Sequence, residues 1–229
     1  MKWRSLDEST SAEDTRSLGE ILAERKALIA KYVLPETQAV HARVVAELAE
    51  SGIRGRASSI GHKAPSFELM DHNGRVVSSA ELLQRSSLVV CFFRGRWCPF
   101  CVGQLEAMNQ IVPQIQEAGG FLVAVSPQTV RQSFFMADQH RLRFPLLSDT
   151  GNQTARQFGL VYQVPDYQQE VYRRAFVNLP FANGDESWEL PVPATYIVGR
   201  NGTIGYAAVR PDYTERPEPI EILAQLRDL

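Results

Sequence analysis

The first hydrophobic patterns along the chain have the spacing of amphipathic helices. Apolar residues recur every three or four positions over residues 18–33 and again over 40–48, and Leu34-Pro35 separates the two sets. Residues 1–16 are polar and are expected to be loose, and residues 53–60 are expected to be a linker. We therefore predict an N-terminal helical extension over residues 1–59. It serves either as a structural cap on the rest of the chain or as a dimerisation arm.

Beyond residue 60 the pattern alternates between short apolar runs and helical spacing. Hairpins are predicted around Asn73-Gly74 and Asn201-Gly202, because Asn-Gly favours a tight turn between strands. Buried strands are predicted over 88–93, 121–125 and 145–147, and helices over 99–119 (kinked at Pro113), 132–140, 152–158 and 218–229. This alternation predicts a layered α/β fold for residues 60–229.

The regular alternation breaks at about residues 159–191. This span is rich in aromatic residues, among them Tyr162, Tyr167, Tyr172, Phe176, Phe181 and Trp188. Long irregular segments inside compact domains are often functional. We interpret residues 159–191 as an insertion that either forms a wall of an active-site cleft or packs over the sheet or against another subunit.

The strand predicted over 88–93 leads into a Cys-x-x-Cys motif at the start of a helix. At the first helical turn, Cys98 and Cys101 lie within disulfide reach of each other. The N-terminal end of a helix carries partial positive charge, which favours a thiolate. Cysteines in this setting commonly have a pKa well below the usual value of about 8.5. The motif therefore predicts a redox-active dithiol.

Three neighbours of the two cysteines are expected to support them. Arg94 and Arg96 would add positive charge close to the sulfurs. Pro99 suits an early helical position, because a proline has no backbone N–H to lose there.

A Cys-x-x-Cys pair can also be half of a structural zinc site, which needs four ligands. The remaining cysteine, Cys91, lies inside a predicted strand, and the four histidines show no ligand spacing. Cys91 is best interpreted as a small hydrophobic residue of the core. We therefore favour a redox dithiol that needs no metal and no organic cofactor.

Composition and charge narrow the possible partners and location. The chain has 229 residues, 44% of them hydrophobic, and a formal net charge of −2, which argues against a nucleic-acid-binding or polybasic membrane role. No run of 18 apolar residues is present, and residues 1–8 contain no apolar signal core. Three cysteines suit a redox enzyme better than a disulfide scaffold, so we expect a cytoplasmic protein.

Several motifs in order resemble the AhpC/TSA (redoxin) peroxiredoxin-like group of the thioredoxin superfamily. The cysteines stand in a thioredoxin-like Trp-Cys-Pro-Phe-Cys sequence that begins at Trp97. The supporting segments are 61–69, 92–101, 125–128, 144–149, 191–198 and 201–204. The resemblance runs from about residue 60 to the C-terminus and implies a thioredoxin fold, a central mixed β-sheet flanked by helices.

The chain also departs from the pattern of that family. Peroxiredoxins carry Pro-x-x-x-Thr-x-x-Cys, and this pattern places the proline at Arg94, the threonine at Cys98 and the peroxide-attacking cysteine at Cys101. The family's arginine would fall near Val192 or Pro193, where no arginine stands.

Three further expectations follow from these departures. Pro193 resembles the cis-proline that faces the dithiol in thioredoxins. Arg210 is a candidate substitute for the missing arginine, although a surface position suits it better. Helix-end charge and the thioredoxin match favour Cys98 as the nucleophile with Cys101 resolving, whereas the peroxiredoxin match reverses the two roles.

The resemblance implies a thiol-dependent peroxidase that reduces hydrogen peroxide or organic hydroperoxides and is re-reduced by a thioredoxin-type donor. A second hypothesis is a thiol–disulfide oxidoreductase acting on disulfide substrates. A third, non-enzymatic hypothesis is a redox-sensing interaction module. A homodimer is compatible with each of them.

Overall fold

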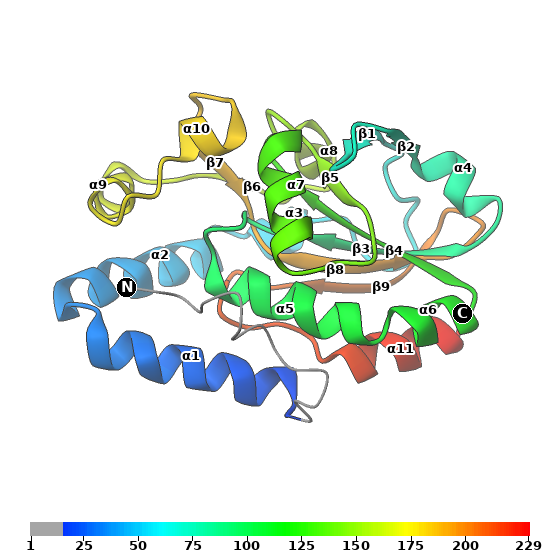
Figure 1. Cartoon of the computed structure of the whole chain (residues 1–229), viewed down its shortest axis with the longest axis horizontal. Helices are drawn as coiled ribbons and strands as arrows, with labels where there is room; N and C mark the ends of the chain where they lie inside the picture. The colour runs from blue at the N-terminus through cyan, green and yellow to red at the C-terminus, as the bar shows by residue number, and fades with distance from the viewer. Residues whose placement is uncertain (1–15) are drawn as a thin grey trace.

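The computed structural model describes residues 16–229, which form a layered α/β structure around one mixed sheet of seven strands (Figure 1). The strands in sheet order are β2 (Val76–Ser78), β1 (Glu68–Asp71), β5 (Leu146–Ser148), β4 (Gly120–Ser126), β3 (Ser87–Phe92), β8 (Ala194–Val198) and β9 (Ile204–Val209). The central strand β3 runs parallel to β4 and antiparallel to β8. The expectation of a loose N-terminus concerns residues that lie, apart from Arg16, outside the described range.

The strand β3 divides the hydrophobic core into two halves because successive side chains of a strand point to opposite faces. Val89 and Cys91 belong to the core on one face, and Val90 and Phe92 belong to the core on the other. All four are fully buried. A near-continuous apolar run is expected for a strand that is covered on both faces.

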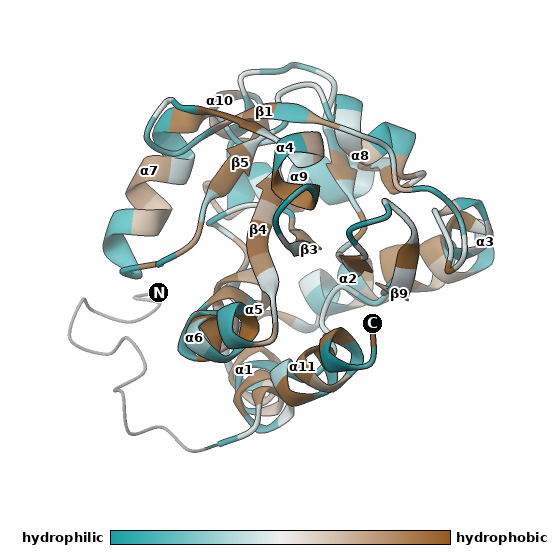
Figure 2. Cartoon of the chain, turned by 90° about the vertical axis from the view of Figure 1, so that its right-hand side faces the viewer, coloured by the Kyte–Doolittle hydropathy of each residue, from teal (hydrophilic) through white to brown (hydrophobic). Residues whose placement is uncertain are grey.

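Helices cover both faces of the sheet. One face is covered by α1 (Leu18–Tyr32), α5 (Pro99–Gln110), α6 (Val112–Glu117), α7 (Val130–Gln139) and α11 (Pro219–Arg227). Figure 2 shows α1, α5, α6 and α11 gathered on one side of the sheet. The other face is covered by α2 (Pro35–Glu50), α3 (Ile53–Arg56), α4 (Ser79–Leu83) and α8 (Gln153–Gln157). No helix within residues 16–229 is both long and apolar enough to cross a membrane.

The two expected N-terminal helices are present as α1 and α2, and they lie on opposite faces of the sheet. Ser17 caps α1 in a reciprocal capping box with Glu20. The Glu218 carboxylate, 200 residues away, accepts hydrogen bonds from the Leu18 and Gly19 N–H groups. These bonds fix the start of α1 to the C-terminal part of the chain.

The structure refines two expectations for the elements of the chain. The long helix after the cysteines is divided into α5 and α6, and Pro113 stands in the first turn of α6. The insertion forms β6 (Val161–Gln163), α9 (Asp166–Arg174), α10 (Leu179–Asn183) and β7 (Glu189–Pro191). Its strands β6 and β7 pair in a separate two-stranded sheet.

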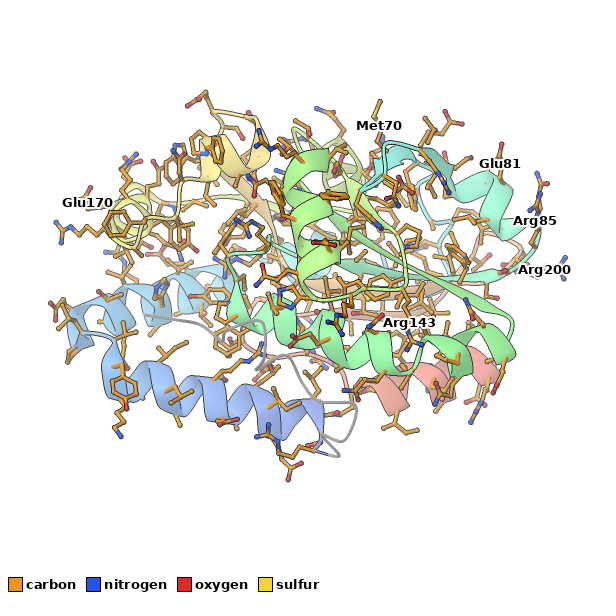
Figure 3. All side chains as sticks on the ribbon, in the orientation of Figure 1. Met70, Glu81, Arg85, Arg143, Glu170 and Arg200 are labelled. Atoms are coloured by element: carbon orange, nitrogen blue, oxygen red, sulfur yellow. The ribbon has the colours of Figure 1, made fainter. Side chains whose placement is uncertain are left out.

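Figure 3 shows charged side chains such as Glu81, Arg85 and Arg200 pointing outward from the body of the protein.

Candidate active site

Strand β3 delivers the two cysteines to the start of α5, as the sequence predicts. Cys98 is the N-cap residue, and Cys101 is the third residue of the helix. The turn before them needs glycine at position 95, where φ is +150° and a Cβ atom would lie 2.5 Å from Trp97 Nε1. Both cysteines are free thiols and are almost completely buried, with exposed fractions of 1% and 0%.

Arg216 supplies a positive charge directly to Cys101. Its Nη2 lies 3.3 Å from Cys101 Sγ. The rest of the guanidinium is held by hydrogen bonds to Gln104 Oε1 at 2.7 Å and to the carbonyl oxygens of Tyr213 and Glu215, each at 2.7 Å. Because every part of the guanidinium group is held, its position against the sulfur is well defined.

Arg94 brings a second cation beside the dithiol. Its side chain is 2% exposed and donates from Nη2 to the Tyr172 hydroxyl. The guanidinium lies 4.0 Å from the ring centre of Tyr213 and 4.8 Å from that of Trp97, so aromatic faces surround it. Within residues 16–229 no ion pair with a carboxylate includes Arg94 or Arg216. A thiolate in the dithiol is the anion that would balance them.

The two sulfurs differ strongly in acidity. Burial by itself would raise the pKa of Cys101, but the hydrogen bond with Cys98 and the charges of Arg216 and Arg94 outweigh burial and lower that pKa to about 5. Burial raises the pKa of Cys98 well above its usual value, and the hydrogen bond to Cys101 raises it further. These opposite shifts favour ionisation of Cys101 over ionisation of Cys98.

Of the residues expected to support the pair, Trp97, Arg94 and Pro99 lie at the site and Arg96 points elsewhere. Pro99 is the first residue of α5, as expected. The exposed Arg96 donates from Nε to Gln132 Oε1 at 2.7 Å, at the start of α7. Its charge is not among the influences on the acidity of either cysteine.

The expectation of a cis-proline at position 193 is wrong. No peptide bond within the described residues is cis, so the Val192–Pro193 bond is trans. The trans form is favoured intrinsically, and a cis bond persists only where the surroundings enforce it. Here Pro193 is the link between β7 of the small sheet and β8 of the main sheet, and its carbonyl accepts from the Arg210 N–H at 3.0 Å.

Sequence reasoning missed Arg216, the residue in contact with Cys101. Arg216 lies 115 residues from Cys101, in a polar segment with no motif, so no local signal marks it. The candidate Arg210 lies on the same segment and lines the same pocket as Arg216, but its charge is not among the main influences on the pKa of either cysteine. Arg216 also connects the site to a buried chain of hydrogen bonds, from Gln104 Nε2 to Thr195 Oγ1 at 3.1 Å and from Thr195 Oγ1 to Cys91 Sγ at 3.9 Å.

The aromatic cover over Arg94 was partly visible in the sequence. Tyr172 and Tyr162 belong to the aromatic-rich insertion, so the structure supports its interpretation as a wall of the site. Two further members come from elsewhere: Tyr213 follows β9, and His41 lies on α2 with its ring 6.1 Å from that of Tyr172. Burial, followed by the charge of Arg94, lowers the pKa of His41 to about 4, so His41 is neutral at pH 7.

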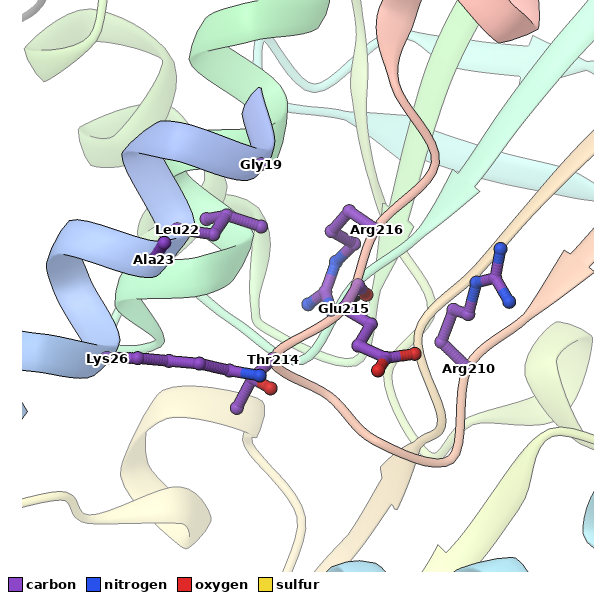
Figure 4. Close-up of a pocket in the computed structure, with 8 residues that line it drawn as sticks. All are labelled: Gly19, Leu22, Ala23, Lys26, Arg210, Thr214, Glu215 and Arg216. Carbon is purple, nitrogen blue, oxygen red and sulfur yellow. Dashed lines mark hydrogen bonds between the residues drawn. The ribbon is translucent and has the colours of Figure 1, made fainter. Parts of the chain in front are cut away.

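A pocket of about 320 Å³ lies between α1 and the segment that follows β9 (Figure 4). It is lined by Gly19, Leu22, Ala23, Lys26, Arg210, Thr214, Glu215 and Arg216. Arg216 is therefore shared by the pocket and by Cys101.

Within the described residues no group of three or more His, Cys, Asp or Glu side chains is placed to hold a metal ion, so the pair lacks the additional ligands of a structural zinc site.

The mixed sheet flanked by helices defines a protein of the thioredoxin fold, and it carries a buried dithiol at the start of α5. Residues 60–207 match the model of the AhpC/TSA family, and the chain belongs to that family. The matched range leaves out α1, α2 and Arg216, although two of these three contact the active-site helix or its cysteine.

Curated relatives of the chain are peroxiredoxins. A chloroplastic peroxiredoxin Q of Oryza sativa subsp. japonica is 28% identical over 148 residues, which is 65% of this chain and 58% of the relative. A putative peroxiredoxin bcp of Haemophilus influenzae is 26% identical over 102 residues, covering 44% of this chain and 65% of that protein. The chain thus matches less than two thirds of the length of either relative.

Solved structures of peroxiredoxins share the fold. Peroxidoxin BcpB from Mycobacterium tuberculosis superposes with a TM-score of 0.59 at 20% identity, covering 74% of this chain and 97% of that one. The mitochondrial 2-cys peroxiredoxin from Plasmodium falciparum superposes with a TM-score of 0.58 at 13% identity, covering 74% and 93%. These likenesses agree with the thioredoxin-type sheet expected from the sequence.

Proposed function

We propose that this protein is a thiol-dependent peroxidase that reduces hydrogen peroxide or organic hydroperoxides, with Cys101 as the nucleophile and Cys98 as the resolving cysteine. The observation that carries the proposal is the Cys101 sulfur, held 3.3 Å from Arg216 Nη2 and acidified by two arginines. A buried, charge-stabilised thiolate is the group that attacks an O–O bond. This order of roles follows the peroxiredoxin pattern and reverses the order favoured by the thioredoxin-like sequence.

The reaction proceeds in two balanced steps. The Cys101 thiolate attacks one peroxide oxygen, the S–O bond forms as the O–O bond breaks, and the alkoxide or hydroxide takes a proton from water. The Cys98 thiol then attacks the Cys101 sulfenic acid, which closes the Cys98–Cys101 disulfide and releases water. Burial holds the pKa of Cys98 high. The Cys98 thiol therefore keeps its proton in the first step and does not compete as the nucleophile.

The second candidate is a thiol–disulfide oxidoreductase, favoured by the absence of the family's threonine and arginine. The burial of both sulfurs argues against large disulfide substrates, because a partner's sulfur must reach within bonding distance of the attacking one. A peroxide of a few atoms needs far less space. We therefore place this candidate second.

The reductant and the location form part of the proposal. A thioredoxin-type donor would return the Cys98–Cys101 disulfide to two thiols, as the family resemblance implies. Two cysteines in a dithiol and a third buried in a strand support a reducing compartment such as the cytoplasm. A homodimer stays an expectation.

Stopped-flow oxidation of the reduced protein tests the proposal. Trp97 adjoins Cys98, so its fluorescence follows the dithiol. With hydrogen peroxide we expect a rate constant orders of magnitude above that of a free cysteine thiolate. Cys98→Ser should retain this first phase and accumulate sulfenic acid, and Cys101→Ser should lose it. The opposite pattern would restore the thioredoxin-like order, and a rate like that of free cysteine would overturn the peroxidase assignment.

A further inference from the structure

Three buried hydrogen-bond donors around the dithiol have no acceptor. They are Arg94 Nε, Trp97 Nε1 and the Tyr162 hydroxyl, and each atom is shielded from solvent. Buried polar groups in folded proteins are nearly always paired, so three unpaired donors in one place call for an explanation. Trp97 and Tyr162 pack in the same apolar cluster, and the Arg94 guanidinium lies 4.8 Å from the Trp97 ring centre.

These donors belong to residues close to the reacting sulfurs. The charges of both cysteines act on the Tyr162 hydroxyl, and Cys98 interacts electrostatically with Arg94. The Arg94 guanidinium acts on the Tyr162 hydroxyl through its charge and through a weak side-chain contact in which the hydroxyl oxygen is the acceptor, so the hydroxyl proton keeps no acceptor of its own. Trp97 directly precedes Cys98. The unsatisfied N–H and O–H groups therefore belong to the immediate surroundings of the dithiol.

The sequence lacks the threonine and the arginine of the family pattern at the matching positions, where Cys98 and the Val192-Pro193 segment stand instead. A peroxidase still has to stabilise the negative charge that develops on the leaving oxygen. Preorganised donors in a dry site are an effective way to do so.

We propose that Arg94 Nε, Trp97 Nε1 and the Tyr162 hydroxyl form an oxygen-binding site that receives the hydroperoxide and donates to its leaving oxygen. This inference rests on the proposed peroxidase function and names the residues that bind the substrate oxygens. As Cys101 Sγ bonds to one oxygen, the other takes the electron pair of the O–O bond, and the three donors stabilise that charge until the oxygen takes a proton from water. The thiolate is oxidised by two electrons and the hydroperoxide is reduced to an alcohol or water.

The surroundings keep these groups in the donor state. Burial raises the pKa of Tyr162, with the charge of Arg94 only partly opposing it, so the phenol keeps its proton at neutral pH. Arg94 is aimed by its bond to the Tyr172 hydroxyl and by the aromatic rings on which it stacks. Its Nε–H stays available because the bond to Tyr172 uses Nη2.

The test compares two reactions of the same thiolate. Tyr162→Phe removes one donor with little change in shape. We expect the rate of oxidation by hydrogen peroxide to fall about 10- to 100-fold. The larger of these values equals the lower end of the loss that follows removal of one oxyanion-hole donor. Alkylation of Cys101 by iodoacetamide, which needs the thiolate but no oxygen site, should stay within about twofold. Trp97→Phe should show the same selective loss.

Tyr167→Phe is the matched control from the same insertion. Its hydroxyl is bound to Glu47 at the surface, so neither rate should change. Equal losses in both reactions of Tyr162→Phe, or no loss in either, would overturn the oxygen site. Failure of the peroxidase proposal itself would be visible separately in the wild-type protein. In that case the ratio of its rate with hydrogen peroxide to its rate of alkylation would be no higher than the same ratio for free cysteine.

Discussion

At the scale of single residues, the proposed nucleophile Cys101 is distinguished from Cys98 by its hydrogen bond with that thiol and by its contact with one arginine. Cys98 and Cys101 are three residues apart and equally buried, yet their pKa values move in opposite directions. The position in the helix does not create this difference, because both sit at the N-terminal end of α5. The hydrogen bond between the two thiols raises the pKa of Cys98 and lowers that of Cys101, and the Arg216 guanidinium, 3.3 Å from Cys101, lowers the pKa of Cys101 further.

Replacing Arg216 should therefore raise the pKa of Cys101. In the wild type, the rate of Cys101 alkylation is expected to rise with pH around a midpoint near 5 and to be level at neutral pH. In Arg216→Met the midpoint should move upward, and in Arg216→Lys it should move less, because the charge remains while the fork of hydrogen bonds is lost. Mass spectrometry of the alkylated peptide measures the profile. An unchanged midpoint in Arg216→Met would contradict the role of this residue.

The same pKa has a consequence for stability. The folded-state pKa of Cys101 lies below its unfolded value of about 8.5, so the thiolate stabilises the folded protein fully above that value. This contribution is lost as the pH falls through about 5, when the folded thiolate is protonated. The loss belongs to the reduced protein, since the disulfide form has no titrating thiol at this position.

At the scale of elements, α1 is fastened to the active-site helix by a buried ion pair. Arg25 on α1 donates from Nη1 to the Pro99 carbonyl and from Nη2 to Glu106 Oε2 at 3.2 Å. Gly103 on α5 makes room for it, since a Cβ atom there would lie 2.4 Å from Arg25 Nη1. His140 approaches the other Glu106 oxygen at 3.0 Å. A helix outside the matched family range thus holds the turn that carries the cysteines.

Arg25→Met should destabilise the protein by about 3 kcal/mol, because it leaves the Glu106 carboxylate buried without its arginine. Denaturant-induced unfolding measures the change. Arg174→Met is the matched control: its pair with Glu170 is exposed, so the loss should be below about 1 kcal/mol. Equal effects of the two substitutions would mean that α1 is not fastened through Arg25.

At the scale of the whole molecule, three distant segments close over the dithiol. Helix α2 contributes His41, the insertion contributes Tyr172 on α9, and the segment after β9 contributes Tyr213 and Arg216. The rings of His41, Tyr172 and Tyr213 surround the buried Arg94, and the half-buried Arg216 contacts Cys101. Disulfide formation removes the thiolate that balances those cations, and buried charge without a counter-charge is costly.

Oxidation should therefore loosen the cover, which would also give a protein reductant access to the disulfide. We expect faster amide hydrogen exchange in α9 and in the segment around residues 213–216 in the oxidised protein than in the reduced protein. The strands β3 and β4, buried in the core, should exchange equally slowly in both forms and serve as the internal reference. Identical exchange of the cover in the two forms would contradict this coupling.

Local sequence determined much of the architecture because patterns over a few residues specify where strands, turns and helices form. The apolar run of β3, the Asn-Gly turns, the break at Pro113 and the helical spacing before residue 50 all act within a few residues of chain. For the same reason the position of Cys98 and Cys101 at the start of a helix was predictable. The aromatic-rich insertion was identifiable from the sequence, and a wall of the site was one of its two interpretations, but the sequence did not show which of its tyrosines lie at the site.

Only the tertiary structure decided the chemistry of the pair. Arg216 reaches Cys101 across 115 residues of chain, and Tyr213 and His41 come to Arg94 from outside the insertion. Burial and charge at a site depend on everything that packs around it, so the acidity of Cys101 is not encoded nearby. The sequence by itself determined that there is a dithiol on a redoxin scaffold, and the packing of distant segments decided which charges and rings surround its two sulfurs.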